Sequence, residues 1–147
     1  MTSKLRGVRV THVVPGTPTA AFTCFNDYSG WKHWAGFPPV TLDREGTDHP
    51  SGVGAIRRFA IIPAVREEIV EFIAPDTMSY TLLGGAPIRN HLGTVTFTAD
   101  GDQCAITWQA QYEPTIPGTG ALIDAVVQWF FRRILHRLGN YLVRQGR

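Results

Sequence analysis

Histidine and tyrosine side chains offer this sequence its best means of moving a proton. A histidine has an ordinary pKa of about 6.5 and can take up or release a proton near neutral pH. The five histidines stand at positions 12, 33, 49, 91 and 136, a scatter without metal-ligand spacing. The sequence contains no His-Glu-x-x-His motif, no phosphate-binding glycine loop ending in Lys and no serine nucleophile elbow. We therefore expect any chemistry to be proton transfer and hydrogen bonding, without a metal.

Length and composition predict one soluble domain over residues 1–147. The 147 residues are 44% hydrophobic and 18% charged, which is enough for one core. A formal charge of +2 does not call for a nucleic acid partner. The most apolar stretch, 121–131, is too short to span a membrane and contains Asp124. No secretory signal and no disulfide framework is recognisable, so we expect a cytoplasmic protein. The oligomeric state stays open, a homodimer included.

The first 40 residues predict a strand and two short helices. The strand is expected over 6–14. Thr17, which precedes a proline, is a suitable cap for the first helix. Trp31 and Trp34 lie three apart, on one face of a second short helix over 28–34.

The rest of the sequence predicts antiparallel strands followed by one long helix. From 40 to 113, turn residues separate segments rich in Val, Ile, Thr, Phe and Tyr. Residues 121–144 have helical periodicity. One wide arc of this helix is apolar: Ile123, Val127, Phe130, Phe131, Ile134, Leu135, Leu138, Tyr141 and Leu142. The other side is polar and basic, and we expect it to face solvent: Gln128, Arg132, Arg133, His136 and Asn140.

Side-chain alternation assigns the last strands to faces. Every second residue from Cys104 to Tyr112 is apolar, so the face that carries Trp108 is expected to be buried. Asp100-Gly101 predicts a two-residue turn, and an even loop places His91 on the same face as Trp108. The four residues 84–87 form another even loop, which adds Tyr80 to that face. The buried face therefore includes one histidine and two tyrosines.

Two earlier strands carry charge toward the interior. Arg57 and Arg58 are adjacent within a strand expected over 53–62, so one of them must face inward. A two-residue turn after the next strand would direct Glu67 and Glu71 inward, whereas a bulge would direct Glu68 inward. A buried charge without a partner is strongly unfavourable. The pattern therefore predicts either an internal ion pair or a wet cavity.

Several segments together resemble the START-like (SRPBCC) proteins of the polyketide cyclase/dehydrase and lipid-transport family. They are the Trp-Lys-His-Trp helix 31–34, Gly-Val-Gly-Ala-Ile-Arg-Arg 52–58, the strand 67–75, Gly-Thr-Val-Thr-Phe 93–97, and Ile-Thr-Trp 106–108 leading to Tyr-Glu-Pro 112–114. The resemblance covers nearly the whole chain and implies a helix-grip fold. In that fold a curved antiparallel sheet and two short helices wrap around a long C-terminal helix and leave an internal hydrophobic cavity.

The resemblance implies a small hydrophobic ligand, such as a lipid, a quinone or a polyketide-like molecule, and no cofactor. The expected ligand-binding residues are Trp34, Phe37, Tyr80, His91, Trp108, Tyr112, Ile123, Val127 and Phe130. Trp34 and Phe37 are candidates for the entrance, although for Trp31 and Trp34 a position in the core is favoured over the entrance. If the protein is an enzyme, it would catalyse aldol-type cyclisation or dehydration, with His91 as acid or base and Arg57 as a hydrogen-bond donor.

Each of these residues also has a structural interpretation. His91 could be a hydrogen-bonded core histidine, and the tyrosine hydroxyls could bond to each other, to His91 or to water. The inward arginine could pair with Glu67, Glu68 or Glu71 instead of touching a ligand. A third function is an interaction protein that binds a macromolecule through Arg132, Arg133 and Arg137.

Overall fold

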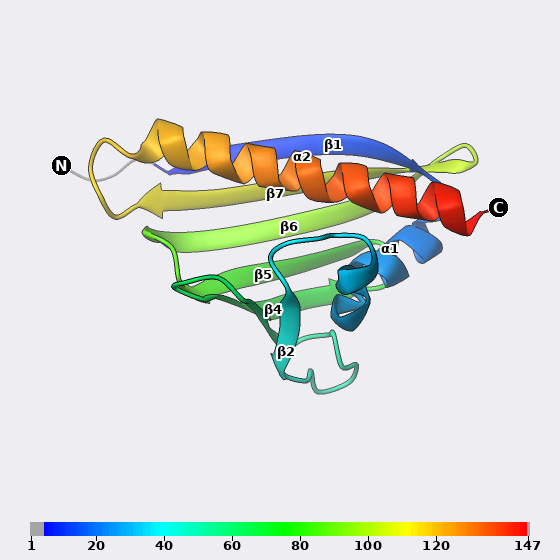
Figure 1. Ribbon diagram of the computed structural model, residues 1–147, viewed down its shortest axis with the longest axis horizontal. Coiled ribbons are helices and arrows are strands. Elements are labelled where there is room, and N and C mark those ends of the chain that lie inside the picture. The colour runs from blue at the N-terminus through cyan, green and yellow to red at the C-terminus, as the bar shows by residue number, and fades with distance from the viewer. Residues whose placement is uncertain (1–4, 147) are drawn as a thin grey trace.

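The computed structural model describes residues 5–146 and contains one antiparallel sheet crossed by a long helix (Figure 1). The seven strands lie in the order β1-β7-β6-β5-β4-β3-β2. Their bounds are β1 Arg6–Pro15, β2 Val40–Arg44, β3 Ile56–Phe59, β4 Val65–Ile73, β5 Thr77–Gly84, β6 Ile88–Asp100 and β7 Gln103–Pro114. Between β1 and β2 the chain forms the helix α1, Pro18–Asn26, and the 3-10 helix η1, Tyr28–His33. The long helix α2, Gly120–Gln145, follows β7. The α+β helix-grip fold is therefore confirmed.

The hairpin of β6 and β7 sets which side chains face α2. Val95 pairs with Trp108, and Tyr80 of β5 pairs with Gly93, so the predicted alternation is confirmed. The turn lies one residue later than expected, because Asp100 still pairs with Gln103. Gly101 occupies the turn with a positive φ of 64°, a conformation that glycine adopts without steric cost. The shift keeps the loop even, and the assignment of faces is unaffected.

The short helices fill the space beneath the second half of α2. Thr17 caps α1 by accepting a hydrogen bond from the Ala20 amide at 3.1 Å, as predicted. The second short helix is a 3-10 helix, one residue shorter than expected. Trp31 is fully buried there, and its indole N–H donates to the Phe25 carbonyl at 2.7 Å. These helices therefore close one end of the space between sheet and helix.

Helix α2 lies across the concave face of the sheet (Figure 1), and the apolar arc that its sequence predicts packs against that face. Its buried side chains are Phe131, Ile134, Leu135 and Leu138. The half-buried side chains that pack beside them are Ile123, Val127, Phe130, Tyr141 and Leu142. An ion pair of 2.7 Å between Arg6 and Asp124 fastens the start of the helix to β1. The helix thus lies across the sheet at a fixed position.

The strand predicted over 53–62 is much shorter in the structure, where β3 holds four residues. Gly54 has φ of 90°, which places a turn before the strand. A three-residue loop joins Ile73 to Thr77, and β4 contains an irregularity between Ile69 and Glu71. With this loop and this bulge, Glu67 faces inward and Glu71 faces outward, so neither of the two alternatives, Glu67 together with Glu71 or Glu68 instead, is correct in full. Glu71 accepts a hydrogen bond from the Ser79 hydroxyl at 3.1 Å.

Candidate ligand-binding site

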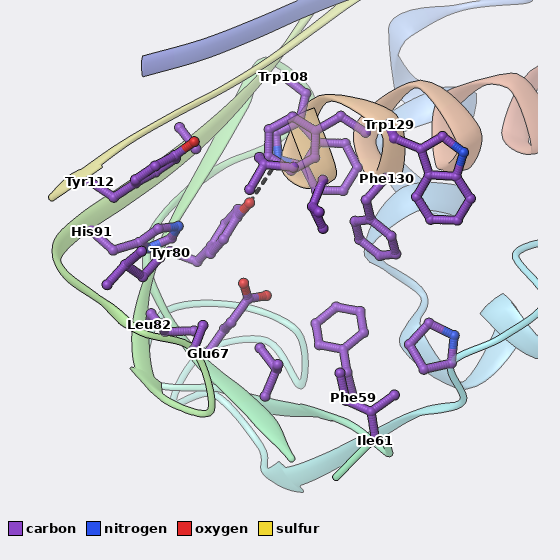
Figure 2. A pocket seen from close by; sticks show the side chains of 18 of the residues that line it. Phe59, Ile61, Glu67, Tyr80, Leu82, His91, Trp108, Tyr112, Trp129 and Phe130 are labelled. Atoms are coloured by element: carbon purple, nitrogen blue, oxygen red, sulfur yellow. Dashed lines mark hydrogen bonds between the residues drawn. The ribbon is translucent and has the colours of Figure 1, made fainter. Parts of the chain in front are cut away.

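A cavity of about 430 Å³ lies between the first half of α2 and the concave face of the sheet (Figure 2). Cavities of this size are typical of small-molecule sites. The sheet strands contribute Phe59, Val65, Glu67, Tyr80, Leu82, Ile88, His91, Trp108, Ala110 and Tyr112. Helix α2 contributes Val126, Val127, Trp129, Phe130, Phe131 and Arg133, and connecting loops contribute Phe37, Pro38, Ile61 and Ala86. Aromatic and aliphatic side chains therefore make up most of the wall.

Tyr80 and Trp108 form the back of the cavity. The Trp108 indole N–H donates to the Tyr80 hydroxyl at 2.7 Å, the bond drawn in Figure 2. Gly93 makes this arrangement possible, since a Cβ there would collide with the Tyr80 ring. Burial raises the pKa of Tyr80, so its hydroxyl keeps its proton at neutral pH. The Trp108 ring also stacks on Phe131 of α2 at 4.0 Å between ring centroids.

His91 reaches the cavity through a bulge in β6. Arg89 pairs with Glu113 and Leu92 with Gln111, so two residues of β6 lie opposite Tyr112 alone. Asn90 absorbs the extra length with φ of 52°. The His91 ring lies 5.3 Å from the Tyr80 ring, and its Nδ1 is buried without a hydrogen-bond partner in the structure. Burial, aided by the charge of Arg57, lowers the pKa of His91 to about 4.

Arg57 and Glu67 form the internal ion pair that the sequence left as one alternative. The Arg57 Nε donates to Glu67 Oε1 at 2.8 Å, and the arginine is fully buried. Its Nη atoms have no hydrogen-bond partner in the described structure. Aromatic faces surround the guanidinium instead, with its Cζ 4.5 Å from the Tyr80 ring centre and 5.2 Å from that of Tyr28. Figure 2 shows the Glu67 carboxylate pointing into the cavity.

The charges of this pair follow from its surroundings. Burial raises the pKa of Glu67, and Arg57 opposes that rise. Burial alone would lower the pKa of Arg57, but Glu67 raises it above its usual value. Neutralising the glutamate would leave a buried guanidinium without a counterion, which is strongly unfavourable. We therefore describe the pair as ionised, with no net charge.

Tyr112 contributes its ring to the cavity wall, but its hydroxyl is already engaged. The hydroxyl donates to Asp124 at 2.6 Å, and Arg6 donates to the same carboxylate at 2.9 Å. The hydrogen bond from Arg6 is the main reason that the pKa of Asp124 lies below its usual value. Tyr112 therefore helps to anchor α2 to the sheet, and its hydroxyl does not serve as a free donor.

The mouth of the cavity lies between α2 and the loop that follows η1. Phe37 and Trp129 line it and are 67% and 61% exposed. Arg133 lies 5.8 Å from the Trp129 ring centre and donates to the Ala35 and Phe37 carbonyls at 3.2 and 3.1 Å. Arg137 donates to the Trp34 carbonyl at 3.5 Å. The expectation that Arg133 simply faces solvent is therefore wrong, because this side chain ties a loop to the helix.

Three expected site residues lie outside the cavity wall. Trp34 is buried in the core, with its ring 5.0 Å from that of Trp31. Ile123 packs against the core near the start of α2. Arg57 lies behind Glu67. The other expected ligand-binding residues line the cavity: Phe37, Tyr80, His91, Trp108, Tyr112, Val127 and Phe130.

The prediction missed several residues of the wall. Trp129 lies off the apolar arc of α2, yet it covers the mouth. Phe59 and Ile61 share a strand face with Arg57, and the sequence left open whether Arg57 or Arg58 faces inward, so these two residues were not predicted. Glu67 was one of three open alternatives. Its spacing of two residues from Ile69, which is fully buried, places both side chains on one face of the strand and is the signal that could have selected it.

Neither a metal cluster nor a membrane-crossing helix occurs among the residues that the structure describes. Within 5–146, no group of three or more His, Cys, Asp and Glu side chains is arranged to hold a metal ion. No helix in that range is long and apolar enough to span a membrane.

A family model described as "Polyketide cyclase / dehydrase and lipid transport" matches residues 6–143. The chain belongs to this family. The match includes all of the strands β1 to β7 and nearly all of α2, so it covers the whole cavity described above. No curated protein matches the chain.

Solved structures show the same fold at low sequence identity. A START superfamily protein from Mycobacterium smegmatis has a TM-score of 0.80 at 11% identity, covering 95% of this chain and 98% of its own. The protein XoxI from Bacillus cereus has a TM-score of 0.76 at 13% identity, with coverage of 96% and 98%. A point mutant of norcoclaurine synthase from Thalictrum flavum, bound to a transition state analogue, has a TM-score of 0.74 at 12% identity, with coverage of 100% and 99%. At these identities the likeness concerns the fold alone.

Proposed function

We propose that this protein binds one small, mainly apolar molecule in the cavity beneath α2. The observation that carries the proposal is an aromatic cavity of about 430 Å³ with a carboxylate pointing into it. A core without a ligand would be expected to close such a space, because empty volume reduces stability. The ligand class that the family allows includes lipids, quinones and polyketide-like molecules.

The first test identifies what the protein carries. The purified protein is examined by native mass spectrometry, and an organic extract of the same sample is analysed for small molecules. A co-purifying apolar molecule at one copy per chain supports the proposal.

A matched pair of variants then places the ligand. Ala110 lines the cavity, whereas Ala105 lies on the opposite face of β7. The probe is N-phenyl-1-naphthylamine, an uncharged dye that fluoresces in apolar sites. Ala110→Leu should weaken its binding severalfold, and Ala105→Leu should leave it unchanged. Equal effects of the two variants, or no dye binding by the unaltered protein, would refute the cavity as the site.

A second candidate function is cyclisation of a poly-β-ketone, and the shared cavity position of Glu67 and His91 favours it. One of these groups would remove a proton from a carbon between two carbonyls. The resulting enolate carbon would attack a second carbonyl of the same chain, the new alkoxide would take up a proton, and water would leave. We place binding ahead of catalysis because a histidine with pKa about 4 is a weak base at neutral pH.

The two functions differ in their response to His91→Ala. An enzyme should lose formation of the cyclised phenol, followed by its ultraviolet absorbance, while binding of the linear ketone weakens little. A carrier should form no product in either version. Parallel losses of product and binding would argue against a catalytic role for His91.

A further inference from the structure

The inner end of the cavity presents an unoccupied hydrogen-bond acceptor. Glu67 Oε1 accepts the bond from Arg57, and within residues 5–146 no hydrogen bond reaches Oε2. The glutamate is 8% exposed, and it points into the cavity past the Tyr80 ring (Figure 2). This oxygen borders the cavity, and a carboxylate oxygen is a strong acceptor for a hydrogen bond from a group that enters the cavity. A ligand group that reaches this point is therefore expected to donate a hydrogen bond.

The same end of the cavity carries no net charge. The charge of Glu67 is balanced by Arg57, which is fully enclosed by the rings of Tyr28, Trp31, Phe59 and Tyr80. His91 is uncharged at neutral pH, and its buried Nδ1 has no partner in the structure. A carboxylate here would meet the Glu67 charge at short range. An ammonium at Glu67 Oε2 would lose its hydration and would give the site a net positive charge, because Arg57 already balances the glutamate. Both are unfavourable in a site shielded from water.

We propose that the Glu67–Arg57 pair makes this cavity selective for uncharged aromatic molecules with a hydroxyl group and excludes carboxylates from its inner end. The aromatic wall of Tyr80, Trp108 and Phe130 receives the flat ring of such a ligand. The hydroxyl donates to Glu67 Oε2. This inference deepens the proposed function and rests on it.

One cation on the wall lies at the other end of the cavity. Arg133 is at the mouth, where its Nη1 already donates to the carbonyls of Ala35 and Phe37. A carboxylate at the mouth would meet this arginine only if its apolar body pointed inward, away from Glu67. The two arrangements can be separated because they depend on different residues.

The test uses four probes with one naphthalene body: naphthalene, 2-naphthol, 2-naphthoate and 2-naphthylmethylammonium. Binding to the full-length protein is measured by isothermal titration calorimetry at neutral pH, where a phenol, like tyrosine, keeps its proton. 2-Naphthol should bind about tenfold more tightly than naphthalene, the gain expected of one hydrogen bond to a charged acceptor. Both charged probes should bind at least about tenfold more weakly than 2-naphthol.

Two variants connect this selectivity to the ion pair. In Arg57→Met/Glu67→Leu both charges are replaced by apolar groups, a change that buried pairs often tolerate. This variant should bind naphthalene and 2-naphthol equally. Glu67→Asp keeps the charge balance but withdraws the carboxylate, so it should reduce the preference for 2-naphthol even if the double variant fails to fold. Ala105→Leu serves as the control and should keep the full preference.

The outcomes separate this inference from the proposed function. If no probe binds, the proposed function itself fails. If naphthalene binds but 2-naphthol gains nothing, or 2-naphthoate binds as tightly as 2-naphthol, the selectivity is overturned and the cavity remains a binding site. Preference for 2-naphthol that persists in Arg57→Met/Glu67→Leu would also overturn the role of the pair.

Discussion

The two halves of the space between α2 and the sheet are built from the same layers but are filled differently. Beneath the second half of α2, the helices α1 and η1 supply Phe25 and Trp31, and Leu135 and Leu138 are fully buried above them. Beneath the first half, no such helix intervenes, and the cavity remains. The short helices near the N-terminus thus determine where the fold is solid and where it is hollow.

Polar groups differ between the halves in the same way. In the packed half the Trp31 indole donates to Phe25, and the Asn26 side chain donates to the Phe22 carbonyl at 2.9 Å. In the hollow half, within residues 5–146, His91 Nδ1 has no partner and one Glu67 oxygen faces the cavity; the Arg57 Nη atoms, which lie behind Glu67 among aromatic rings, also have none. Folding normally satisfies buried polar groups, so unsatisfied ones that gather at a cavity indicate a place for a ligand or for water.

The largest expected change in stability comes from shortening a buried leucine to alanine in the packed half, compared with the same substitution on the cavity wall. Leu135→Ala should lower the free energy of unfolding by about 4 kcal/mol, because the side chain is fully buried and leaves a void. Leu82→Ala on the cavity wall should lower it by less than about 1 kcal/mol, since Leu82 already borders empty space. Urea denaturation gives both values. Comparable losses would mean that the two halves are equally packed.

The ion pair is the next test of the hollow half. Glu67→Gln should destabilise the protein by about 3 kcal/mol, because it leaves the fully buried Arg57 without a counterion. Arg57→Met/Glu67→Leu should recover most of that loss, since it removes both charges. Chemical denaturation of the two variants beside the unaltered protein measures the difference. A Glu67→Gln variant of unaltered stability would contradict an ionised pair.

The sequence predicts the regular elements of both halves. Alternation within β7 and helical periodicity in α2 identified buried residues in each, from Leu135 in the packed half to Trp108 and Phe130 at the cavity, because both patterns report contact with an apolar core. The family resemblance supplied the cavity, and strand parity placed Tyr80 and His91 on its side of the sheet. Each of these inferences depends on regular elements whose side-chain directions follow from spacing.

The residues that escaped prediction lie where regular spacing breaks. The choice among the glutamates depended on a loop length and a bulge in β4, neither of which the residue types determine. Trp129 and Arg133 face a loop rather than the sheet, so the hydrophobic arc of α2 did not include them. Trp34 was a candidate for both the entrance and the core, and it is buried against Trp31; which of the two applies depends on how η1 ends.

His91 should make the hollow half sensitive to acid. Its pKa is about 4 in the folded protein and about 6.5 in an unfolded chain, so at pH values between these the unfolded state binds more protons. Stability should therefore be complete above about pH 6.5 and fall as the pH drops toward 4. Between about pH 7 and pH 5 the unaltered protein should lose about 2 kcal/mol more than His91→Gln does. Urea midpoints of both proteins at the two pH values measure this difference, and equal losses would show that His91 is not shielded from water.

The smallest effect is expected at the mouth, where Arg133 joins the hollow half of α2 to the loop after η1. Arg133→Gln should lower the free energy of unfolding by about 1 kcal/mol, because it removes two hydrogen bonds that a partly exposed cation makes to carbonyls. Arg132→Gln is the matched control, since Arg132 is exposed on the neighbouring position, and it should change stability by less than about 0.5 kcal/mol. Amide hydrogen exchange across 35–37 should accelerate in Arg133→Gln alone. If both variants behave alike, the arginine does not hold the loop, and the mouth must be positioned by apolar contacts such as those of Phe37 and Trp129.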